Sequence, residues 1–399
     1  WNVLVGGSIP YLCRLLTAGR IRLENMVNKS SAASSGKKKV FMLVLFFLFI
    51  IVVSVYNTSN KLTYIASIHS TIRSNLRYIF MGIQSRNTSF DVTFNGTLPL
   101  PTTAFVTHNE VNTIVLNNIQ QQRPDACEAC FSHNFEYVIE NHVVCQLCSD
   151  SQEIDLIIFI FTTHQRQQER NAIRQTWLNY TNKNTANIRY SFLLGEVPDE
   201  NLRKLVEEEN KIHNDIIKED FVDTYQNLTY KTMMAFKYAV TKCSYAKFVM
   251  KTDDDMWINI PGLLKVIKRE NKTLQSAVSG ACHHVAGPIR DPSSKWYASF
   301  RSYPHDSYPG FCSGTGYVTS MNVARKVFEI SKNVPFFHLE DVYVAICIRK
   351  LRYRLHPIAG FNIGRPHFDP CLYKGDNLVT SHEVSSGMLI SFWNTPCRR

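Results

Sequence analysis

Apolar runs of strand length alternate with segments of helical periodicity between residues 154 and 250. This alternation is typical of a sheet of parallel strands whose two faces are both covered by helices. The sequence therefore predicts an α/β fold with a mainly parallel sheet. The expected strands are residues 154–161, 188–194 and 247–250, and the expected helices are residues 168–179, 200–213 and 227–243.

The expected strand at residues 247–250 leads into three consecutive carboxylates, Asp253, Asp254 and Asp255. Ligands of open α/β sheets bind beyond the carboxyl ends of the strands, where this cluster would lie. Adjacent carboxylates repel one another unless a cation neutralises them, and oxygen ligands suit magnesium or manganese. Such a cation can bridge the phosphates of a nucleotide diphosphate. A solvated acidic turn is the alternative interpretation.

A pair of arginines follows the first expected core strand. Arg170 and Arg174 are four residues apart, so a helix presents both on one face, where they could meet phosphate oxygens. The same spacing is equally typical of a solvated helix face. Three further segments follow in a distinctive order: residues 220–229 (DFVDTYQNLT), 307–317 (SYPGFCSGTGY) and 339–344 (LEDVYV).

Taken together in this order, these segments closely resemble the animal β1,3-galactosyltransferase and β1,3-N-acetylglucosaminyltransferase family, from about Phe135 to the C-terminus. The resemblance implies a GT-A type nucleotide-sugar-binding fold and a type II membrane protein of the Golgi apparatus. It implies a hexosyltransferase that moves galactose or N-acetylglucosamine, with inversion, from UDP-galactose or UDP-N-acetylglucosamine. The acceptor would be a glycan on a glycoprotein or glycolipid, the new linkage β1,3 and the cofactor Mn²⁺.

The resemblance also suggests metal ligands and donor contacts. Asp253 and Asp255 match the family's DxD motif, with Asp255 the expected direct metal ligand. His382 matches the family's C-terminal histidine and is expected to contact the metal or the diphosphate; a surface-loop histidine is the alternative. Further donor contacts are expected from Arg170, Arg174, Lys251 and Asp254.

The resemblance places the acceptor side around Lys295–Tyr297 and a turn from Gly314 to Tyr317. An aromatic ring such as Trp296 can stack on a sugar face, although a tryptophan is as easily a core residue. The residues expected to contact the acceptor are Trp296, Gly316 and Tyr317.

Asp341 is the predicted general base. An inverting transfer needs one carboxylate to take the acceptor proton, and carboxylates bound to a divalent cation are poor bases. Asp341 lies in the segment that resembles the family's catalytic one. Glu340 is the alternative base, and both carboxylates could instead cap a helix expected at residues 342–351. The family usually has glycine where this chain has Ala345, a change that removes no reactive group.

Residues 40–56 form a run of 17 residues without a charge, 14 of which are Leu, Ile, Val or Phe. The run predicts a transmembrane signal anchor, and the triplet Lys37–Lys39 before it places the N-terminus in the cytosol. We expect a cytoplasmic tail at residues 1–39, a lumenal stem at residues 57–124 and a catalytic domain at residues 125–399. Residues 1–25 contain no methionine and are interpreted as an extension of the gene model, with no function assigned.

Glycosylation sequons and cysteines agree with a lumenal location. Six sequons follow the apolar run, at Asn57, Asn87, Asn95, Asn179, Asn227 and Asn271. Ten of the eleven cysteines also follow it, which permits up to five disulfides in an oxidising compartment. Two C-x-x-C pairs, at residues 127–130 and 145–148, have nearly zinc-ribbon spacing, but the compartment favours disulfides. Their connectivity does not follow from the sequence.

The net charge of +11 does not indicate a nucleic-acid-binding protein, because +6 of it comes from residues 1–56. A catalytically inactive lumenal relative that binds sugars or acts like a chaperone is the competing function. Such a protein needs neither a metal nor a base, and the intact acidic residues argue against it. A different donor or linkage is the alternative among enzymes, and the sequence does not identify the acceptor glycan or the oligomeric state.

Overall fold

The computed structural model describes residues 123–147, 149 and 152–398. The predictions for the cytoplasmic tail, the membrane anchor and nearly all of the stem lie outside the described residues. No helix in the described part is long and apolar enough to cross a membrane. The strands are β1 (Tyr137–Ile139), β2 (Leu156–Phe161), β3 (Ile188–Glu196), β4 (Ile216–Val222), β5 (Phe248–Asp253), β6 (Trp257–Ile258), β7 (Ala277–His283), β8 (Phe311–Ser320), β9 (Arg354–Pro357) and β10 (Thr380–Ser381). The α-helices are α4 (Gln167–Gln175), α5 (Glu200–His213), α6 (Leu228–Lys242), α7 (Ile260–Leu274), α8 (Met321–Ser331), α9 (Glu340–Lys350), α10 (Pro370–Lys374) and α11 (Ser386–Asn394).

Eight of these strands form one mixed sheet in the order β1-β4-β3-β2-β5-β8-β7-β9. The run β4-β3-β2-β5 is parallel throughout, and β7 is parallel to β9. Strand β8 is antiparallel to both of its neighbours, and β1 is antiparallel to β4. The predicted α/β fold with a mainly parallel sheet is therefore confirmed, with β8 and β1 as the antiparallel members that the sequence pattern did not predict.

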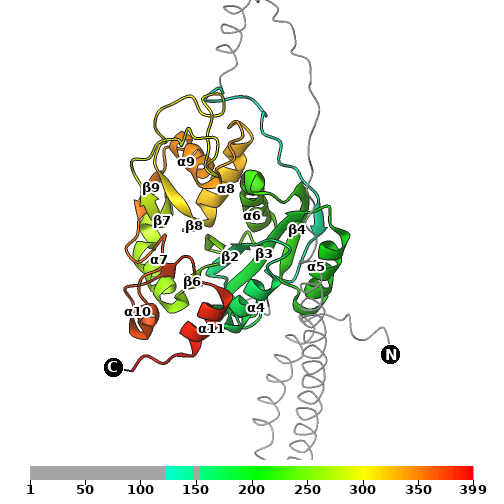
Figure 1. The fold of residues 1–399 in the computed structure, drawn as a ribbon, viewed down its shortest axis with the longest axis vertical. Helices are drawn as coiled ribbons and strands as arrows, with labels where there is room; N and C mark the ends of the chain where they lie inside the picture. Colours follow the sequence, from blue (N-terminus) through cyan, green and yellow to red (C-terminus); the bar gives the residue numbers. More distant parts are fainter. Residues whose placement is uncertain (1–122, 148, 150–151, 399) are drawn as a thin grey trace, which may run out of the picture. The chain divides into compact units, whose positions relative to one another are not determined.

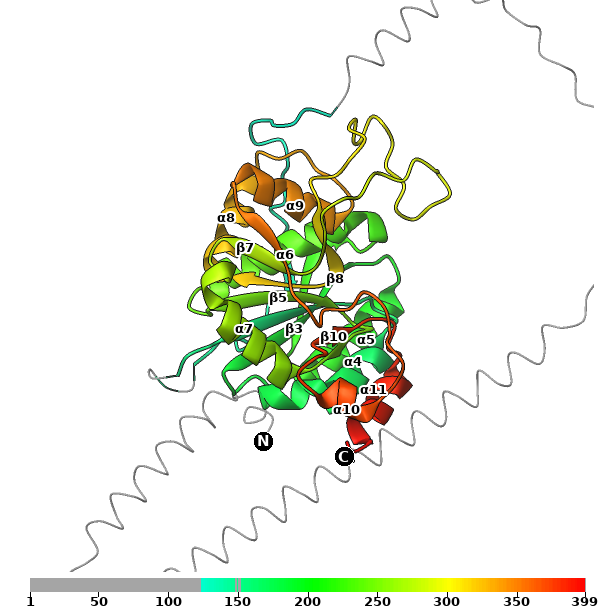
Figure 2. The ribbon, with the colours of Figure 1, turned by 90° about the vertical axis from the view of Figure 1, so that its left-hand side faces the viewer.

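Helices cover both faces of the sheet, with α6, α8 and α9 on one side and α4, α7 and α11 on the other (Figures 1 and 2). Strand β2 shows why the chain adopts this arrangement, because all six of its residues are buried and successive side chains point to opposite faces. Phe159 packs into the core that contains α6, α8 and α9. Ile158 and Ile160 pack into the second core, with α4, α7 and α11.

The boundaries of the expected elements agree with the structure where capping signals are strong. Helix α5 has the expected bounds and begins after Asp199, whose side chain accepts hydrogen bonds from the backbone N–H groups of Asn201 and Leu202. The helix expected at residues 168–179 instead ends at Gln175 and continues as a 3₁₀ helix, Trp177–Thr181. The fully buried indole of Trp177 donates to the Met256 carbonyl at 3.0 Å, which fixes the chain at this break.

The C-terminal segment returns to the acidic cluster. Strand β10 pairs antiparallel with β6, which begins directly after that cluster. The side-chain amide of Asn259 donates to the carbonyls of Gly375 and Leu378, and its backbone N–H donates to Val379. Residues more than a hundred positions apart are thereby held against each other next to the end of β5.

Four disulfides confirm the expectation of oxidised cysteines. Cys127 bonds to its neighbour in the same C-x-x-C pair, and Cys145 bonds to a cysteine far along the chain, so the zinc-ribbon alternative is wrong. Among the described cysteines, only Cys347, buried in α9, is a free thiol. The pairs are Cys127–Cys130, Cys145–Cys243, Cys282–Cys312 and Cys371–Cys397.

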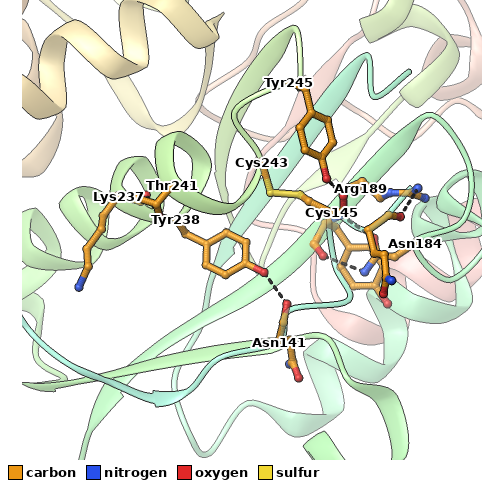
Figure 3. Close-up of a disulfide and its surroundings, with 11 residues drawn as sticks. Asn141, Cys145, Asn184, Arg189, Lys237, Tyr238, Thr241, Cys243 and Tyr245 are labelled. Atoms are coloured by element: carbon orange, nitrogen blue, oxygen red, sulfur yellow. Dashed lines mark hydrogen bonds between the residues drawn. A yellow bond between two sulfur atoms is a disulfide. The ribbon is translucent and has the colours of Figure 1, made fainter. Parts of the chain in front are cut away.

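The Cys145–Cys243 disulfide fastens the segment before β2 to the end of α6 (Figure 3). Two tyrosine hydroxyls reinforce the junction: Tyr245 donates to the Cys145 carbonyl, and Tyr238 donates to the Asn141 carbonyl. Because the segment before β2 is otherwise irregular, these contacts set where the central strand enters the sheet.

Candidate active site

The candidate site begins where β5 leaves the sheet. Asp253 is the last residue of this strand and lies opposite Phe161, the last residue of the parallel strand β2. Two strands therefore end together here, as the rule for open α/β sheets requires of a ligand site. The acidic cluster extends beyond this edge, and its three carboxylates have different partners.

Lys251 and Glu340 form a buried ion pair beneath the acidic cluster. The Lys251 ammonium lies 2.8 Å from Asp253 Oδ1 and 3.0 Å from Glu340 Oε1, and it also donates to the Gly314 carbonyl. Burial acts against its charge, but the two carboxylates keep the pKa of Lys251 above its ordinary value. Lys251 is therefore a fixed positive charge that orients Asp253 and joins β5 to the start of α9.

The buried carboxylate of Glu340 has two hydrogen-bond donors besides Lys251. Its Oε2 accepts hydrogen bonds from the Thr232 hydroxyl at 3.1 Å and the Tyr317 hydroxyl at 3.0 Å. Burial raises the pKa of Glu340 to about 7, although Lys251 acts to lower it. A carboxylate with this many internal partners has little freedom to reach a substrate.

Asp341, the next residue, is more open. Its Oδ2 accepts from the backbone N–H of Gly314 at 3.1 Å, and its Oδ1 accepts from the backbone N–H of Val342 at 2.8 Å. Burial raises its pKa, while these two N–H groups act to lower it. Gly314 matters sterically as well, because a Cβ at this position would lie 2.5 Å from Glu340 Oε1. Helix α9 begins at Glu340, two residues earlier than expected, so both carboxylates lie in its first turn, and its N-cap residue, Leu339, makes no side-chain capping bond. The bond to Val342 satisfies one N–H group of that turn, which is compatible with the base assignment.

Asp255 faces the C-terminal histidine. His382 Nε2 lies 3.3 Å from Asp255 Oδ2, and Nδ1 lies 3.0 Å from the Ile363 carbonyl, to which it donates. Burial acts to raise the pKa of Asp255, but the hydrogen bond with His382 holds it below its ordinary value. The same bond is the main cause that raises the pKa of His382. The pairing of β6 with β10 brings these two residues together.

Asp255 and His382 fit a divalent cation. Asp255 Oδ1 is buried and has no hydrogen-bond partner among the residues that the structure describes, which is costly for a carboxylate unless a cation meets it. In neutral His382, donation from Nδ1 to a backbone carbonyl leaves the Nε2 lone pair facing the carboxylate, as in metal-bound histidines. Within the described residues, no group of three or more His, Cys, Asp or Glu side chains could hold a metal by itself, so remaining ligands would come from a substrate or water.

Asp254, which was expected to contact the donor, forms an ion pair with Arg166, a residue that was not among the predicted site residues. Its Oδ2 accepts from Arg166 Nε at 2.7 Å, and only 7% of its side chain is exposed. Burial raises its pKa to about 6, against the opposing effect of Arg166. The Arg166 side chain is 37% exposed, so this arginine, which lies between β2 and α4, is the cation that faces the site.

Arg170 and Arg174 differ from the expectation of phosphate contacts. Arg170 is fully buried and forms a two-point ion pair with Glu209, and Arg174 binds Glu209 and Asp215. Arg170 also donates to Thr162 and Thr163. These bonds occupy both guanidinium groups, so the two arginines join α4 to α5 and to the start of β4 instead of facing an open site.

Gly316 and Tyr317 also differ from the expectation of acceptor contacts. They lie within β8, paired with β5, rather than in a turn. Tyr317 is 1% exposed, and its hydroxyl donates a hydrogen bond to Glu340. It is therefore a core residue that positions Glu340. Ala345 is a buried residue of α9, where its methyl group requires no unusual backbone conformation.

Trp296 is an exposed residue of the long loop at residues 284–310, with 48% of its surface accessible. Lys295 Nζ lies 4.6 Å from the Trp296 ring centroid and 5.8 Å from that of Tyr225. Burial and the negative charge of Asp341 raise the pKa of Tyr225. Trp296 and Tyr225 therefore both lie against the Lys295 ammonium as exposed aromatic side chains, and the alternative of a core tryptophan is wrong.

Sequence reasoning missed Arg166, Tyr225 and Asn259. Arg166 carried a usable signal, because it follows the first core strand directly. Tyr225 lies within the segment already singled out at residues 220–229. Asn259 carried no signal, since its partners come from a segment distant in sequence.

The amino-acid sequence is similar to those of known galactosyltransferases. The Galactosyltransferase family model matches residues 168–358. The mouse and human "Beta-1,3-galactosyltransferase 1" are each 41% identical over 266 residues, which is 66% of this chain and 78% of theirs. The human "Beta-1,3-galactosyltransferase 5" is 40% identical over 60% of this chain and 77% of its own.

Likeness to solved structures is weaker. A glycosyltransferase involved in the glycosylation of the major capsid of PBCV-1 covers 59% of this chain and 97% of its own, with 10% identity and a TM-score of 0.34, too low to assign the GT-A type. The sequence relatives, in contrast, share most of their length with this chain at high identity. The chain therefore belongs to the β1,3-galactosyltransferase family of hexosyltransferases.

Proposed function

We propose that this protein transfers galactose from UDP-galactose to a hydroxyl of a glycan acceptor, forming a β1,3 linkage with inversion. One observation carries the proposal. Lys251, Asp253, Glu340 and Asp341 meet at the end of β5, and Asp255 with His382 lies in the same acidic cluster. A committed cation site and a separate carboxylate base are the two parts that an inverting sugar transfer needs.

The donor diphosphate would lie against the acidic strand end. Asp255 and His382 would hold Mn²⁺, and Asp253, the third predicted ligand, lies next to them with its Oδ1 on Lys251. Arg166 would add a positive charge beside Asp254. When bound, the cation would neutralise charge on the diphosphate as it leaves. The Lys251 ammonium, 2.8 Å from Asp253 Oδ1, fixes the orientation of this carboxylate.

Asp341 would act as the base. The acceptor hydroxyl oxygen forms the new bond to the anomeric carbon, and the bond from that carbon to the phosphate oxygen breaks, so that UDP leaves with the electron pair. The hydroxyl proton goes to the Asp341 carboxylate. Trp296 and Tyr225 would hold the acceptor sugar by stacking on its apolar face.

The wider predictions remain part of this proposal. It includes a GT-A type fold and a single-pass type II anchor in the Golgi membrane. The disulfides support a catalytic domain in the lumen of the secretory pathway, because disulfides form in oxidising compartments. The expected role is glycosylation of glycoproteins or glycolipids.

The test is to incubate the full chain with Mn²⁺, a panel of neutral glycan acceptors and either UDP-galactose or UDP-N-acetylglucosamine, and to determine the linkage of the product. We expect galactose in a β1,3 linkage, and loss of transfer after chelation that Mn²⁺ restores. Transfer of N-acetylglucosamine alone would overturn the donor assignment. UDP release without transfer would favour the inactive relative, and full activity in chelator would exclude the metal role.

A further inference from the structure

A second cavity, separate from the candidate active site, has a volume of about 560 Å³, within the range of small-ligand sites. Its walls come from three parts of the chain: residues 123–126, the 303–309 part of the long loop, and the last turns of α9. The active-site residues described above are not among its lining residues.

The charge of this cavity is unbalanced. Arg123, Arg349 and Lys350 line it, and the one acidic residue in the lining, Asp125, lies 3.1 Å from His305. Within the described part of the chain, the side chains of Arg349 and Lys350 form no ion pair or hydrogen bond, and part of their charge is offset by the carboxyl end of α9. No such helix end offsets Arg123, which comes from another segment.

Arg123 carries the strongest sign of a missing ligand. Its guanidinium donates from Nη2 to the Pro335 carbonyl and lies 5.6 Å from the Phe337 ring centroid. Its Nε is buried and has no hydrogen-bond partner among the described residues. Burial lowers the pKa of this arginine, as expected for a guanidinium without an anion beside it. A guanidinium charge held in a largely buried position is costly, and an anion in the cavity would stabilise this charge through space.

The position of the cavity connects it to the acceptor side. The long loop at residues 284–310 supplies both the exposed Trp296 and the Tyr303 and His305 wall of the cavity. Helix α9 carries Asp341 at its start and Arg349 near its end, about 12 Å apart at 1.5 Å per residue. One further sugar unit of an acceptor could therefore reach from one site to the other.

We propose that this cavity binds an anionic group carried by a sugar, a carboxylate or a sulfate, on the acceptor glycan. A cavity of this volume can take a single sugar ring, and its guanidinium groups suit carboxylates and sulfates. This inference rests on the proposed function, because it identifies the anion as part of the acceptor glycan. The binding event can be measured without turnover.

The test uses the full chain and isothermal titration calorimetry without donor. The probes are lactose, lactose 3′-sulfate and a glucuronic acid–galactose disaccharide, so that sulfate and carboxylate are compared with a neutral parent. At least one acidic probe should bind about tenfold more tightly than lactose, and the gap should narrow as salt rises. Equal affinities for all three probes would overturn the inference.

Arg349→Gln/Lys350→Gln should abolish the preference for the acidic probe and leave lactose binding unchanged. Lys211→Gln/Lys268→Gln, which removes two exposed lysines from α5 and α7, is the control with the same change in charge. An equal loss in both variants would show a general charge effect and reject the site. If the first variant does not fold, the salt series with wild-type protein still decides.

Failure of the two proposals can be distinguished. Galactose transfer to neutral acceptors without any acidic preference would reject the cavity alone. An acidic preference that depends on Arg349 and Lys350, without any transfer, would reject the proposed function alone.

Discussion

Asp341 and Glu340 are adjacent carboxylates in different surroundings. Glu340 is bound to Lys251, Thr232 and Tyr317, whereas Asp341 accepts only backbone N–H groups. We therefore expect Asp341→Asn to lower kcat by ~10²- to 10⁴-fold, because the amide keeps the shape but cannot take a proton. Affinity for UDP with Mn²⁺ and the melting temperature should stay near wild type.

Glu340→Gln is the matched comparison for that variant. It removes the partner of a buried lysine, so it should lower the melting temperature as well as the rate. If Asp341→Asn keeps most of its kcat while Glu340→Gln is inactive yet folded, the base is Glu340. If both variants stay active, the base assignment is wrong.

His133 is expected to make the free energy of unfolding depend on pH. It is buried among Phe131 and Phe328, with Nε2 2.8 Å from the Ser331 hydroxyl, and burial lowers its pKa to about 4. An unfolded histidine titrates near pH 6.5, so between that value and pH 4 only the unfolded chain binds this proton. Stability present above pH 6.5 is then lost as the pH falls, by up to roughly 3 kcal/mol.

His133→Gln should remove that part of the pH dependence. The measurement is the free energy of unfolding of wild type and variant from pH 7.5 to pH 4.5, and the difference between them should shift in favour of the variant as the pH falls. His142→Gln, at a side chain that is 70% exposed, is the control. A constant difference across this range would contradict the buried neutral state of His133.

The pairing of the short strands β6 and β10 brings His382 close to Asp255. The side chain of Asn259 stabilises this arrangement through hydrogen bonds to the C-terminal segment. Asn259→Ala removes two side-chain bonds to the C-terminal segment and the cap of α7. We expect Mn²⁺ affinity to fall by about 10- to 100-fold, the range seen when groups that orient metal ligands are lost. The measurement is Mn²⁺ binding in the presence of UDP.

A double-mutant cycle separates this role from general destabilisation. If Asn259 acts through His382, adding Asn259→Ala to His382→Ala should cost little further metal affinity. Additive losses would show that Asn259 supports the fold but does not position the histidine.

At the scale of the whole molecule, the disulfides constrain loops of different length. Cys145–Cys243 spans 98 residues and Cys371–Cys397 spans 26. The loop-closure relation gives about 4.7 and about 3.5 kcal/mol for the two. Replacing the first pair by alanine should therefore lower the free energy of unfolding by roughly 1 kcal/mol more than replacing the second. Equal losses by denaturant titration would show that native-state strain, not chain entropy, dominates.

Local signals in the chain were enough to predict the α/β class of the fold and a transfer of sugar from a nucleotide donor. Strands such as β2 and helices such as α5 are recognisable because their burial pattern and caps are local in sequence. The acidic cluster at a strand end and the segment with Asp341 were recognisable for the same reason. These local signals also sufficed to identify the family.

The hydrogen-bond and ion-pair partners of the site residues, in contrast, became known from the three-dimensional structure. Two arginines that look alike in sequence, Arg166 and Arg170, have opposite fates: the first faces the site beside Asp254, and the second is buried against Glu209. Tyr317 lies in the core because β8 pairs with β5, and His382 reaches Asp255 because β10 pairs with β6. Each outcome depends on contacts between residues far apart in the chain, whose free energy exists only once the sheet has formed.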